Sequence, residues 1–314
     1  MNDEKPFDET EFIKAAIPVM RSDSGGFKSL LLQGIPKFLP LSSSPERAKI
    51  KLPERYYSYN SMEKIDETLI DSLVDTYVKV FGDDEIDKNT GEVIWGEGWK
   101  CINCGKIIPL NQGSSGICQS CNGELKPYYN RDELKDRFIS ELRPSEDIKP
   151  CLGIMYGNED TLVGGFVECC VGSWNGISDR IFNARFKGND SGRQELLQVE
   201  QALQERGANL ENILYEDEMG TLRADDPDTN FRDVPGSFFN LARVAFEHGV
   251  YNGAKEAVFW TSTRSQVFRL ASMYGFEAIH QTADGLVFLY HPDIVSLLKI
   301  QQNVSPNLIR RLAK

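Results

Sequence analysis

The chain has 314 residues, of which 40% are hydrophobic, and its formal net charge is −12. This length and composition suffice for a buried core and predict one large domain or two small ones. The lack of a long apolar run argues against a membrane span, and the first residues lack the basic-then-apolar order of a secretory signal. The acidity disfavours broad nucleic-acid binding and mildly favours a cationic partner.

The N-terminal part contains one clear helical pattern. Residues 1–54 carry no assignable chemistry, and we expect them to form a packing arm. From residue 61 to 82 an apolar stripe recurs at helical spacing, formed by Ile65, Leu69, Leu73 and Tyr77. Residues 83–91 are acidic and rich in turn formers but lack the ligand spacing of a calcium loop, so we expect a solvated acidic loop.

Four cysteines form the strongest local motif, two C-x-x-C units contributed by Cys101 and Cys104 and by Cys118 and Cys121. Two such knuckles can direct four thiolates at one tetrahedral zinc ion. Two disulfides or a redox C-x-x-C are the alternatives. A redox pair normally opens a helix, however, whereas both pairs lie among Gly, Asn, Pro and Ser. We therefore predict a structural Zn²⁺ in a ribbon over residues 96–127.

The remaining three cysteines fall in apolar, strand-like segments, at Cys151, Cys169 and Cys170. Together with the paired C-x-x-C units they favour a reducing compartment, and we expect the protein to be cytoplasmic.

Three elements are predicted after the ribbon. They are a helix over residues 132–142, a hairpin of two largely buried strands over 150–156 and 161–171, and a helical insertion over 172–210 with Leu196, Val199 and Leu203 in phase.

Residues 211–223 read as a strand with three consecutive carboxyl groups, Glu216, Asp217 and Glu218. Strict alternation places Asp217 on one face and Glu216 and Glu218 on the other. Near the centre of a sheet such groups are costly unless they are paired, solvated or raised in pKa. A carboxyl group with a raised pKa suits removal of a proton from an ammonium group. The alternative is that the three mark a strand end facing solvent.

Residues 230–290 alternate helices and strands in a fixed order. A loop (residues 230–237, NFRDVPGS) leads into a helical stripe from Phe238 to Phe246. A buried strand at 256–261, a helix at 265–274 and a hairpin of strands 277–281 and 286–290 then follow.

This order resembles the second half of the GNAT acyltransferase superfamily, in which an Arg/Gln-x-x-Gly-x-Gly/Ala loop opens a helix that holds the pyrophosphate of coenzyme A. Arg232 matches the first position of that loop, Pro235 stands at its first glycine, and Ser237 stands at its last position. Proline has no N–H to donate, so Gly236 would supply the close backbone approach. The resemblance implies a coenzyme A site at Arg232, Val234, Gly236 and Ser237.

The resemblance also implies a fold class and a reaction. The fold would be α/β (α+β), with a mixed central sheet flanked by helices. The reaction would transfer an acyl group, most often acetyl, from acetyl-CoA or another acyl-CoA to an amine of a small molecule or protein. Attack would be direct, since no Cys/His nucleophile pairing is apparent.

The family commonly carries its general base as a Glu on the central strand. Glu218 is our first choice and Glu216 the second, while Asp217 would orient the acceptor cation. The family's usual acid, a Tyr, aligns with Ala271. Tyr274, about one turn away, is a substitute, and Ser272 or water are further alternatives.

We thus predict a packing arm (1–54), a GNAT-like domain (55–292) with the ribbon (96–127) and the helical insertion (172–210) near the acceptor entrance, and a C-terminal helical tail (293–314). The rival interpretation is a catalytically degenerate module whose ribbon recruits a protein or nucleic-acid partner. Pro235 and Ala271 favour it. The acceptor, the acyl length and the oligomeric state stay open.

Overall fold

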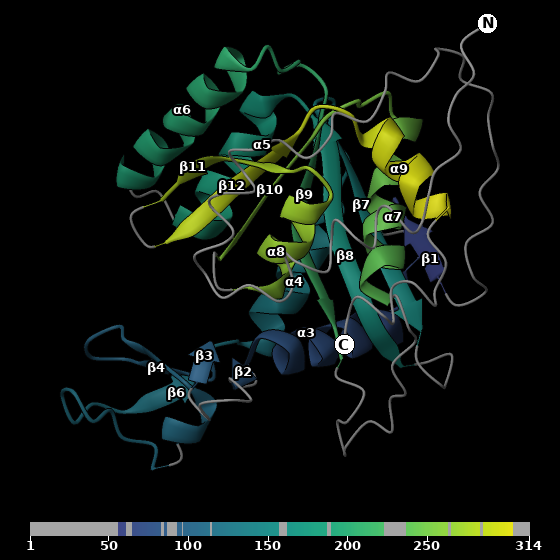
Figure 1. Ribbon diagram of the computed structural model, residues 1–314. Coiled ribbons are helices and arrows are strands. Elements are labelled where there is room, and N and C mark those ends of the chain that lie inside the picture. The colour runs from purple at the N-terminus through teal and green to yellow at the C-terminus, as the bar shows by residue number, and fades with distance from the viewer. Residues whose placement is uncertain are drawn as a thin grey trace, which may run out of the picture.

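A computed structural model gives the fold (Figure 1). It describes residues 56–60, 65–82, 85–86, 93–95, 97–113, 115–156, 162–186, 190–222, 237–262, 265–282 and 285–303. The predicted packing arm and most of the predicted pyrophosphate loop, residues 230–236, lie outside these ranges.

The fold is organised on a seven-stranded sheet with the strand order β1-β7-β8-β9-β10-β12-β11. Of the neighbouring strands, β9 and β10 run parallel and the other pairs run antiparallel. The bounds are β1 (Tyr56–Tyr59), β7 (Ile148–Tyr156), β8 (Val163–Gly172), β9 (Ile213–Thr221), β10 (Ala257–Ser262), β11 (Glu277–Gln281) and β12 (Leu286–His291). Helices cover both faces of this mixed sheet, which confirms the predicted fold class. The edge strand β1 was not predicted.

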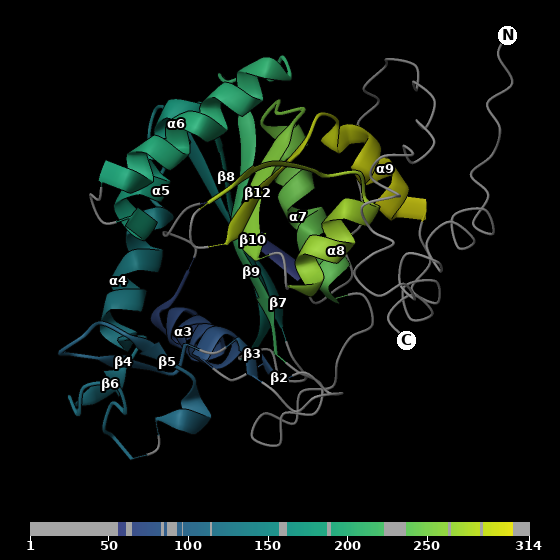
Figure 2. The ribbon, with the colours of Figure 1, turned by 60° about the vertical axis from the view of Figure 1, so that its left-hand side comes forward.

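One face of the sheet is covered by α7 (Ser237–Tyr251), α8 (Gln266–Met273) and α9 (Ile294–Asn303) (Figure 2). Leu241, Ala245 and Phe246 of α7 pack on Val167 and Leu214 of the sheet, and all five are buried. The crossover from β9 through α7 to the parallel β10 puts the first turn of α7 beyond the C-terminal end of β9.

The opposite face carries α3 (Glu67–Gly82), α4 (Arg131–Glu141), α5 (Trp174–Ile181) and α6 (Asp190–Glu205). The predicted stripe of the first helix is buried, with Leu73 fully enclosed against Phe138 of α4 and Phe166 of β8. The insertion over residues 172–210 is helical as predicted. Its apolar residues Trp174, Val199 and others pack on the sheet, so α5 and α6 belong to the main core.

A second, small sheet lies between α3 and α4 in the chain and beside α3 in space (Figure 1). Its order is β5-β4-β6, with β4 (Trp99–Cys101), β5 (Ile107–Ile108) and β6 (Leu125–Pro127), and a 3-10 turn at Leu110–Gln112 follows β5. Two shorter strands, β2 (Glu85–Ile86) and β3 (Val93–Trp95), pair just before it. Its own core consists of Cys101, Ile108, Cys118 and Leu125, with Trp99 packed against them. This cysteine-bearing sheet is called the ribbon below.

Candidate active site

A cavity of about 1710 Å³ lies where the ribbon, α4 and the ends of β9 and β10 meet. Its walls include Lys100 and Ile102 of the ribbon, Arg137 of α4, Glu216 of β9 and Thr261 of β10. The cavity therefore joins the ribbon to the only parallel strand pair of the described sheet.

The parallel strands separate inside this cavity. Their register pairs end at Phe259 opposite Glu216, although β9 continues to Thr221 along β8 and β10 continues to Ser262 along β12. The backbone groups of residues 217–219 and 260–262 that would pair between these strands are therefore not paired with each other. This wedge gives a ligand access to backbone groups of β9 beyond Glu216 that are not paired to β10.

Side chains of the two strands are hydrogen-bonded to each other at the point where the strands part. The indole Nε1 of Trp260 on β10 donates to the hydroxyl of Tyr215 on β9 at 2.7 Å. That hydroxyl in turn donates to Oδ1 of Asp217 at 3.2 Å.

A β-bulge in β9 decides which way its carboxyl groups face. In the register with β8, Glu218 lies opposite Glu168, and Glu216 lies opposite the next residue, Cys169, so Asp217 is the extra residue. Asp217 and Glu218 consequently both approach charged groups on the α4 and α5 side. The alternation predicted for this strand is wrong here, because the bulge turns Glu216 and Glu218 to opposite faces.

Glu216 is the isolated carboxyl group of the three. It is 7% exposed, lines the cavity, and has no hydrogen-bond or ion-pair partner among the described residues. Burial alone raises the pKa of its carboxyl group to about 7. A group with this pKa is half ionised near neutral pH and can accept a proton.

Glu218 is held by side chains from two helices. Its Oε1 accepts from the hydroxyl of Tyr77 on α3 at 2.8 Å, and its Oε2 lies 2.7 Å from Nη2 of Arg137 on α4. Burial raises the pKa of Glu218, and the guanidinium of Arg137 opposes that shift. These contacts fix Glu218 in place and engage both of its oxygens.

Asp217 belongs to a second buried group centred on Arg180 of α5. Nη2 of Arg180 lies 2.5 Å from Oε1 of Glu168, its Nε lies 3.5 Å from Oδ2 of Asp217, and Nη2 lies 3.7 Å from Oε2 of Glu141. Burial, reinforced by Glu168, raises the pKa of Glu141 to about 11. The site thus holds more carboxyl groups than guanidinium groups.

Of the remaining predicted site residues, the structure describes Tyr274 and Ser237. Tyr274 packs against the core under α7 and is not among the cavity-lining residues, and burial raises its pKa. Of the predicted pyrophosphate loop, Ser237 is the first residue of α7, whereas Arg232, Val234 and Gly236 lie outside the described residues.

Sequence reasoning missed Tyr77, Arg137 and Arg180 as site residues. They come from three different helices and share no local motif. The one signal available was the run of three carboxyl groups in a buried strand, which requires buried counter-charges from elsewhere in the chain.

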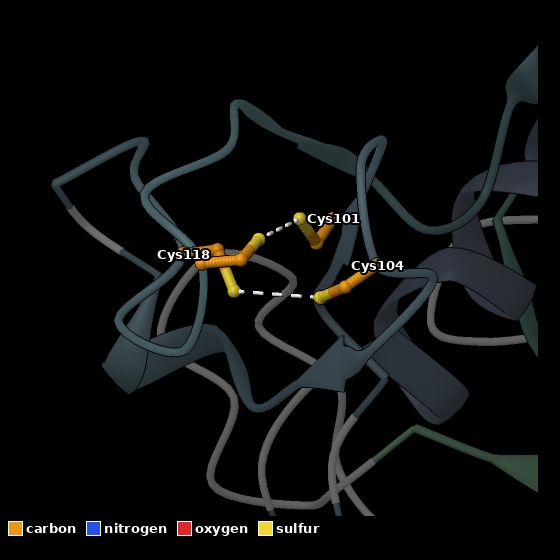
Figure 3. A group of neighbouring side chains, drawn as sticks. Cys101, Cys104 and Cys118 are labelled. Atoms are coloured by element: carbon orange, nitrogen blue, oxygen red, sulfur yellow. Dashed lines mark hydrogen bonds between the residues drawn. The ribbon is translucent and has the colours of Figure 1, made fainter.

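The four cysteines of the ribbon converge on one point (Figure 3). Sγ of Cys101 lies 3.4 Å from Sγ of Cys121, Sγ of Cys104 lies 3.8 Å from Sγ of Cys118, and all four sulfurs lie within 4.8 Å of one another. A tetrahedron of sulfurs at about 2.3 Å from a zinc ion has edges of about 3.8 Å. The four residues are thus spaced so that they could hold a metal ion.

The two knuckles of the ribbon are built alike. In each, the residue after the second cysteine donates its N–H to the carbonyl of the first, from Gly105 to Cys101 at 3.0 Å and from Asn122 to Cys118 at 2.8 Å. Both donors have positive φ, 71° for Gly105 and 56° for Asn122. The turn directs backbone N–H groups toward the sulfurs. The backbone N–H of Cys104 lowers the pKa of the Cys101 thiol to about 6, which favours the thiolate.

Comparison with known proteins gives structural similarity only. No protein-family model matches the sequence, and no curated protein matches it. Among solved structures, arylalkylamine N-acetyltransferase 2 from Aedes aegypti is 11% identical with a TM-score of 0.41, covering 76% of this chain and 98% of the other. An agmatine N-acetyltransferase is 10% identical with a TM-score of 0.40, covering 76% and 99%. The PaiA N-acetyltransferase from Thermoplasma acidophilum, in complex with coenzyme A, is 10% identical with a TM-score of 0.35, covering 76% and 98%.

No helix in the described ranges has both the length and the apolar character needed to cross a bilayer.

Proposed function

We propose that this chain is an acyl-CoA-dependent N-acyltransferase that transfers an acyl group, most simply acetyl, to an amine. The observation that carries the proposal is the buried, unpartnered carboxyl group of Glu216 at the point where two parallel strands part beside a large cavity. Attack of an amine on a thioester requires a proton acceptor beside hydrogen-bond donors for the carbonyl oxygen, and Glu216 lies beside N–H groups of β9 that are not paired to β10.

The wedge supplies hydrogen-bond donors for the thioester carbonyl. Backbone N–H groups of β9 beyond Glu216 that are not paired to β10 can donate to a thioester oxygen, on which negative charge develops during attack. The first N–H groups of α7 have no partner within the helix and favour an anion, which suits a pyrophosphate. We keep Arg232, Val234, Gly236 and Ser237 as the proposed coenzyme A site on the strength of the sequence.

The contacts of the three carboxyl groups support a division of roles that differs from our first choice of base. Glu216 would take the proton of the attacking ammonium group, because its pKa is near 7 and nothing else engages it. The amine nitrogen forms a bond to the carbonyl carbon and gives up its second proton to solvent, the carbon–sulfur bond breaks, and the departing thiolate takes a proton from solvent. Glu218 and Asp217, held by Arg137 and Arg180, would face the acceptor.

The metal assignment is part of the same proposal. We assign one structural Zn²⁺ to Cys101, Cys104, Cys118 and Cys121, since four thiolates fill a tetrahedral shell and leave no position for catalysis. The ribbon would then serve as a rigid wall of the acceptor cavity, to which it contributes Lys100 and Ile102. A cytoplasmic location follows from the seven unbonded cysteines and is proposed on that basis.

A second candidate function is a non-catalytic binding module, and one observation favours it. Four of the seven exposed large hydrophobic side chains in the described part of the chain lie on the ribbon, at Ile102, Ile107, Leu110 and Ile117. Clustered exposed apolar side chains often mark a protein-binding surface.

Calorimetry with acetyl-CoA separates the two functions. The transferase requires binding, and it requires release of coenzyme A when an amine is added. Absence of binding at millimolar acetyl-CoA eliminates the transferase and leaves the binding module. The matched control is Glu216→Gln, which should bind acetyl-CoA like the unmodified protein but turn over poorly.

A further inference from the structure

The three-stranded sheet of the ribbon has a covered face and an open face. The covered face carries the ribbon's core, formed by Trp99, Cys101, Ile108, Cys118 and Leu125. Successive side chains of a strand point to opposite faces, so Lys100, between Trp99 and Cys101 on β4, points away from this core and from the cysteine sulfurs. The positive charge of Lys100 is therefore not directed at the metal-binding thiolates.

Two lysines lie side by side on the open face. Lys100 of β4 is the direct register partner of Lys126 of β6. Side chains that face each other across an antiparallel pair have Cβ atoms about 4.5–5.5 Å apart, and like charges in this position destabilise the pair. Both lysines are exposed, and neither is paired with a carboxyl group among the residues that the structure describes. A bound anion would relieve the repulsion between them.

Exposed apolar side chains flank the two lysines. Ile107 of β5 is the register partner of Lys100 on its other side and is 40% exposed. Ile102, directly after β4, is 53% exposed and lines the cavity together with Lys100 and Lys126. The open face thus combines two cations with two isoleucines.

The charge of the open face is opposite to that of the chain as a whole. Residues 97–127 contain three lysines and two glutamates, whereas the formal net charge of the chain is −12. Of the neighbouring carboxyl groups that line the cavity, Glu97 accepts from the hydroxyl of Tyr129, and Glu133 is not paired with either lysine in the described structure. An acidic ligand is therefore repelled by most of the protein and attracted at the ribbon.

The cavity is large enough for an extended acceptor. Its volume of about 1710 Å³ exceeds the range of about 300–1,000 Å³ that is typical of sites for small molecules. An acyl-CoA would fill part of this space, and the open face of the ribbon lines the same cavity as Glu216. An acceptor that contacts both Glu216 and the ribbon is a chain rather than a small amine.

We infer that the open face of the ribbon binds an acidic segment of a polypeptide acceptor, with carboxylates at Lys100 and Lys126 and apolar side chains against Ile102 and Ile107. This rests on the proposed function, in which an amine of the same polypeptide reacts at Glu216. A polypeptide fits this face better than a nucleic acid does. Two lysines supply few phosphate contacts, the acidic chain repels a polyanion, and isoleucines suit apolar side chains.

Binding of matched peptides to the full-length protein tests the docking surface without catalysis. One short peptide has a free N-terminal amine followed by glutamates and leucines, and its counterpart has glutamine in place of each glutamate. We expect the glutamate peptide to bind about threefold to tenfold more tightly in fluorescence anisotropy. This difference should shrink when NaCl is raised from about 50 mM to about 500 mM. Equal affinities of the two peptides at low salt would overturn the inference.

Two charge reversals on the ribbon locate the effect. Lys126→Glu should remove the preference for the glutamate peptide and favour a peptide with lysine in place of each glutamate. The matched control is Lys106→Glu, because Nζ of Lys106 donates to Oγ of Ser120 at 3.0 Å and this residue is not among those that line the cavity. The control should keep the preference for glutamate, and equal effects of the two variants would refute the assignment. If Lys126→Glu does not fold, the peptide pair and its salt dependence on the unmodified protein decide.

Turnover with saturating acetyl-CoA separates this inference from the proposed function. If the glutamate peptide binds preferentially but no peptide releases coenzyme A, the transferase proposal fails and the docking surface stands. If both peptides release coenzyme A with equal kcat/KM, the transferase stands and the docking surface is refuted. The docking surface is also refuted if Lys126→Glu weakens binding of acetyl-CoA instead of the peptide, or if a single-stranded oligonucleotide binds the ribbon more tightly than the glutamate peptide does.

Discussion

Glu216 and Glu218 are two residues apart and have opposite surroundings. Glu216 has no polar partner in the described structure, and burial raises its pKa to about 7. Glu218 accepts a hydrogen bond from Tyr77 and pairs with Arg137. A proton acceptor must be ionised yet free to receive a proton, whereas a positioning group must be held. We therefore expect Glu216 to act as the proton acceptor and Glu218 as a positioning group, although both are glutamates, because their neighbours differ.

The first prediction concerns Glu216→Gln. The active form of the base is the carboxylate, which is populated above its pKa. In the unmodified protein kcat/KM should therefore rise about tenfold per pH unit below pH 7 and flatten above it. In the variant this rise of kcat/KM below pH 7 should disappear, and kcat should fall by about 10²- to 10³-fold. Steady-state kinetics between pH 5.5 and about 8.5 measures both. An unchanged pH profile would return the role of base to Glu218 or to water.

The second prediction concerns Tyr274, the substitute acid suggested by the sequence. It lies outside the cavity lining and packs against the core under α7. We expect Tyr274→Phe to change kcat by less than tenfold, below the contribution of about 10²- to 10⁴-fold that a general acid makes. A larger loss of kcat in a variant with normal thermal stability would restore Tyr274 as the acid.

At the scale of the elements, Arg180 links α5 to the sheet and to α4 through charged and hydrogen-bonded contacts. Its side chain reaches Glu168 of β8 and Asp217 of β9, and Nη1 donates to the carbonyl oxygen of Glu141 at the end of α4, at 3.1 Å. Glu168 is 1% exposed, so its charge depends on this partner and on Arg137. Removing one member of a buried ionic group is costly because the other charges stay buried.

The third prediction follows from this arrangement. Arg180→Met should lower the free energy of unfolding by about 3–5 kcal/mol, as expected for a broken buried ion pair. Adding Glu168→Gln to that variant should recover part of the loss, because it removes the uncompensated charge. Lys135→Met breaks a more exposed pair with Glu67 and Asp71 and should lower the free energy of unfolding far less than Arg180→Met does. Urea denaturation of the three variants gives the comparison, and equal losses for Arg180 and Lys135 would contradict it.

At the scale of the whole molecule, the ribbon and the main domain have separate cores but share the cavity. The buried residues of the ribbon, Cys101, Ile108, Cys118 and Leu125, belong to no cluster of the seven-stranded sheet. Lys100 and Ile102 nonetheless line the same cavity as Glu216. Loss of the ribbon should therefore change the acceptor site without unfolding the sheet.

The fourth prediction uses Cys118→Ser. The unmodified protein should contain one zinc per chain by elemental analysis, and the variant should contain much less, since one thiolate of the shell is missing. We expect the acceptor KM to rise, while the affinity for acetyl-CoA and the main unfolding transition stay unchanged. A metal-free preparation with a folded ribbon and full activity would refute the zinc assignment.

The sequence by itself determined the elements and the cysteine motif. The spacing of apolar residues predicted α3, α4, α6 and the helices and strands between residues 237 and 291, because a stripe at period 3.6 or a buried run depends only on nearby residues. The C-x-x-C units likewise predicted the convergence of Cys101, Cys104, Cys118 and Cys121, since each knuckle is a local turn.

Only the tertiary structure decided how the carboxyl groups of β9 differ. The bulge at Asp217 arises from the register between β8 and β9, and it placed Glu218 on the face of Asp217, whereas alternation had placed it on the face of Glu216. The partners Tyr77, Arg137 and Arg180 come from helices separated from β9 by many residues along the chain. A pKa depends on burial and on charges a few ångströms away in space, and those distances do not exist until the chain has folded.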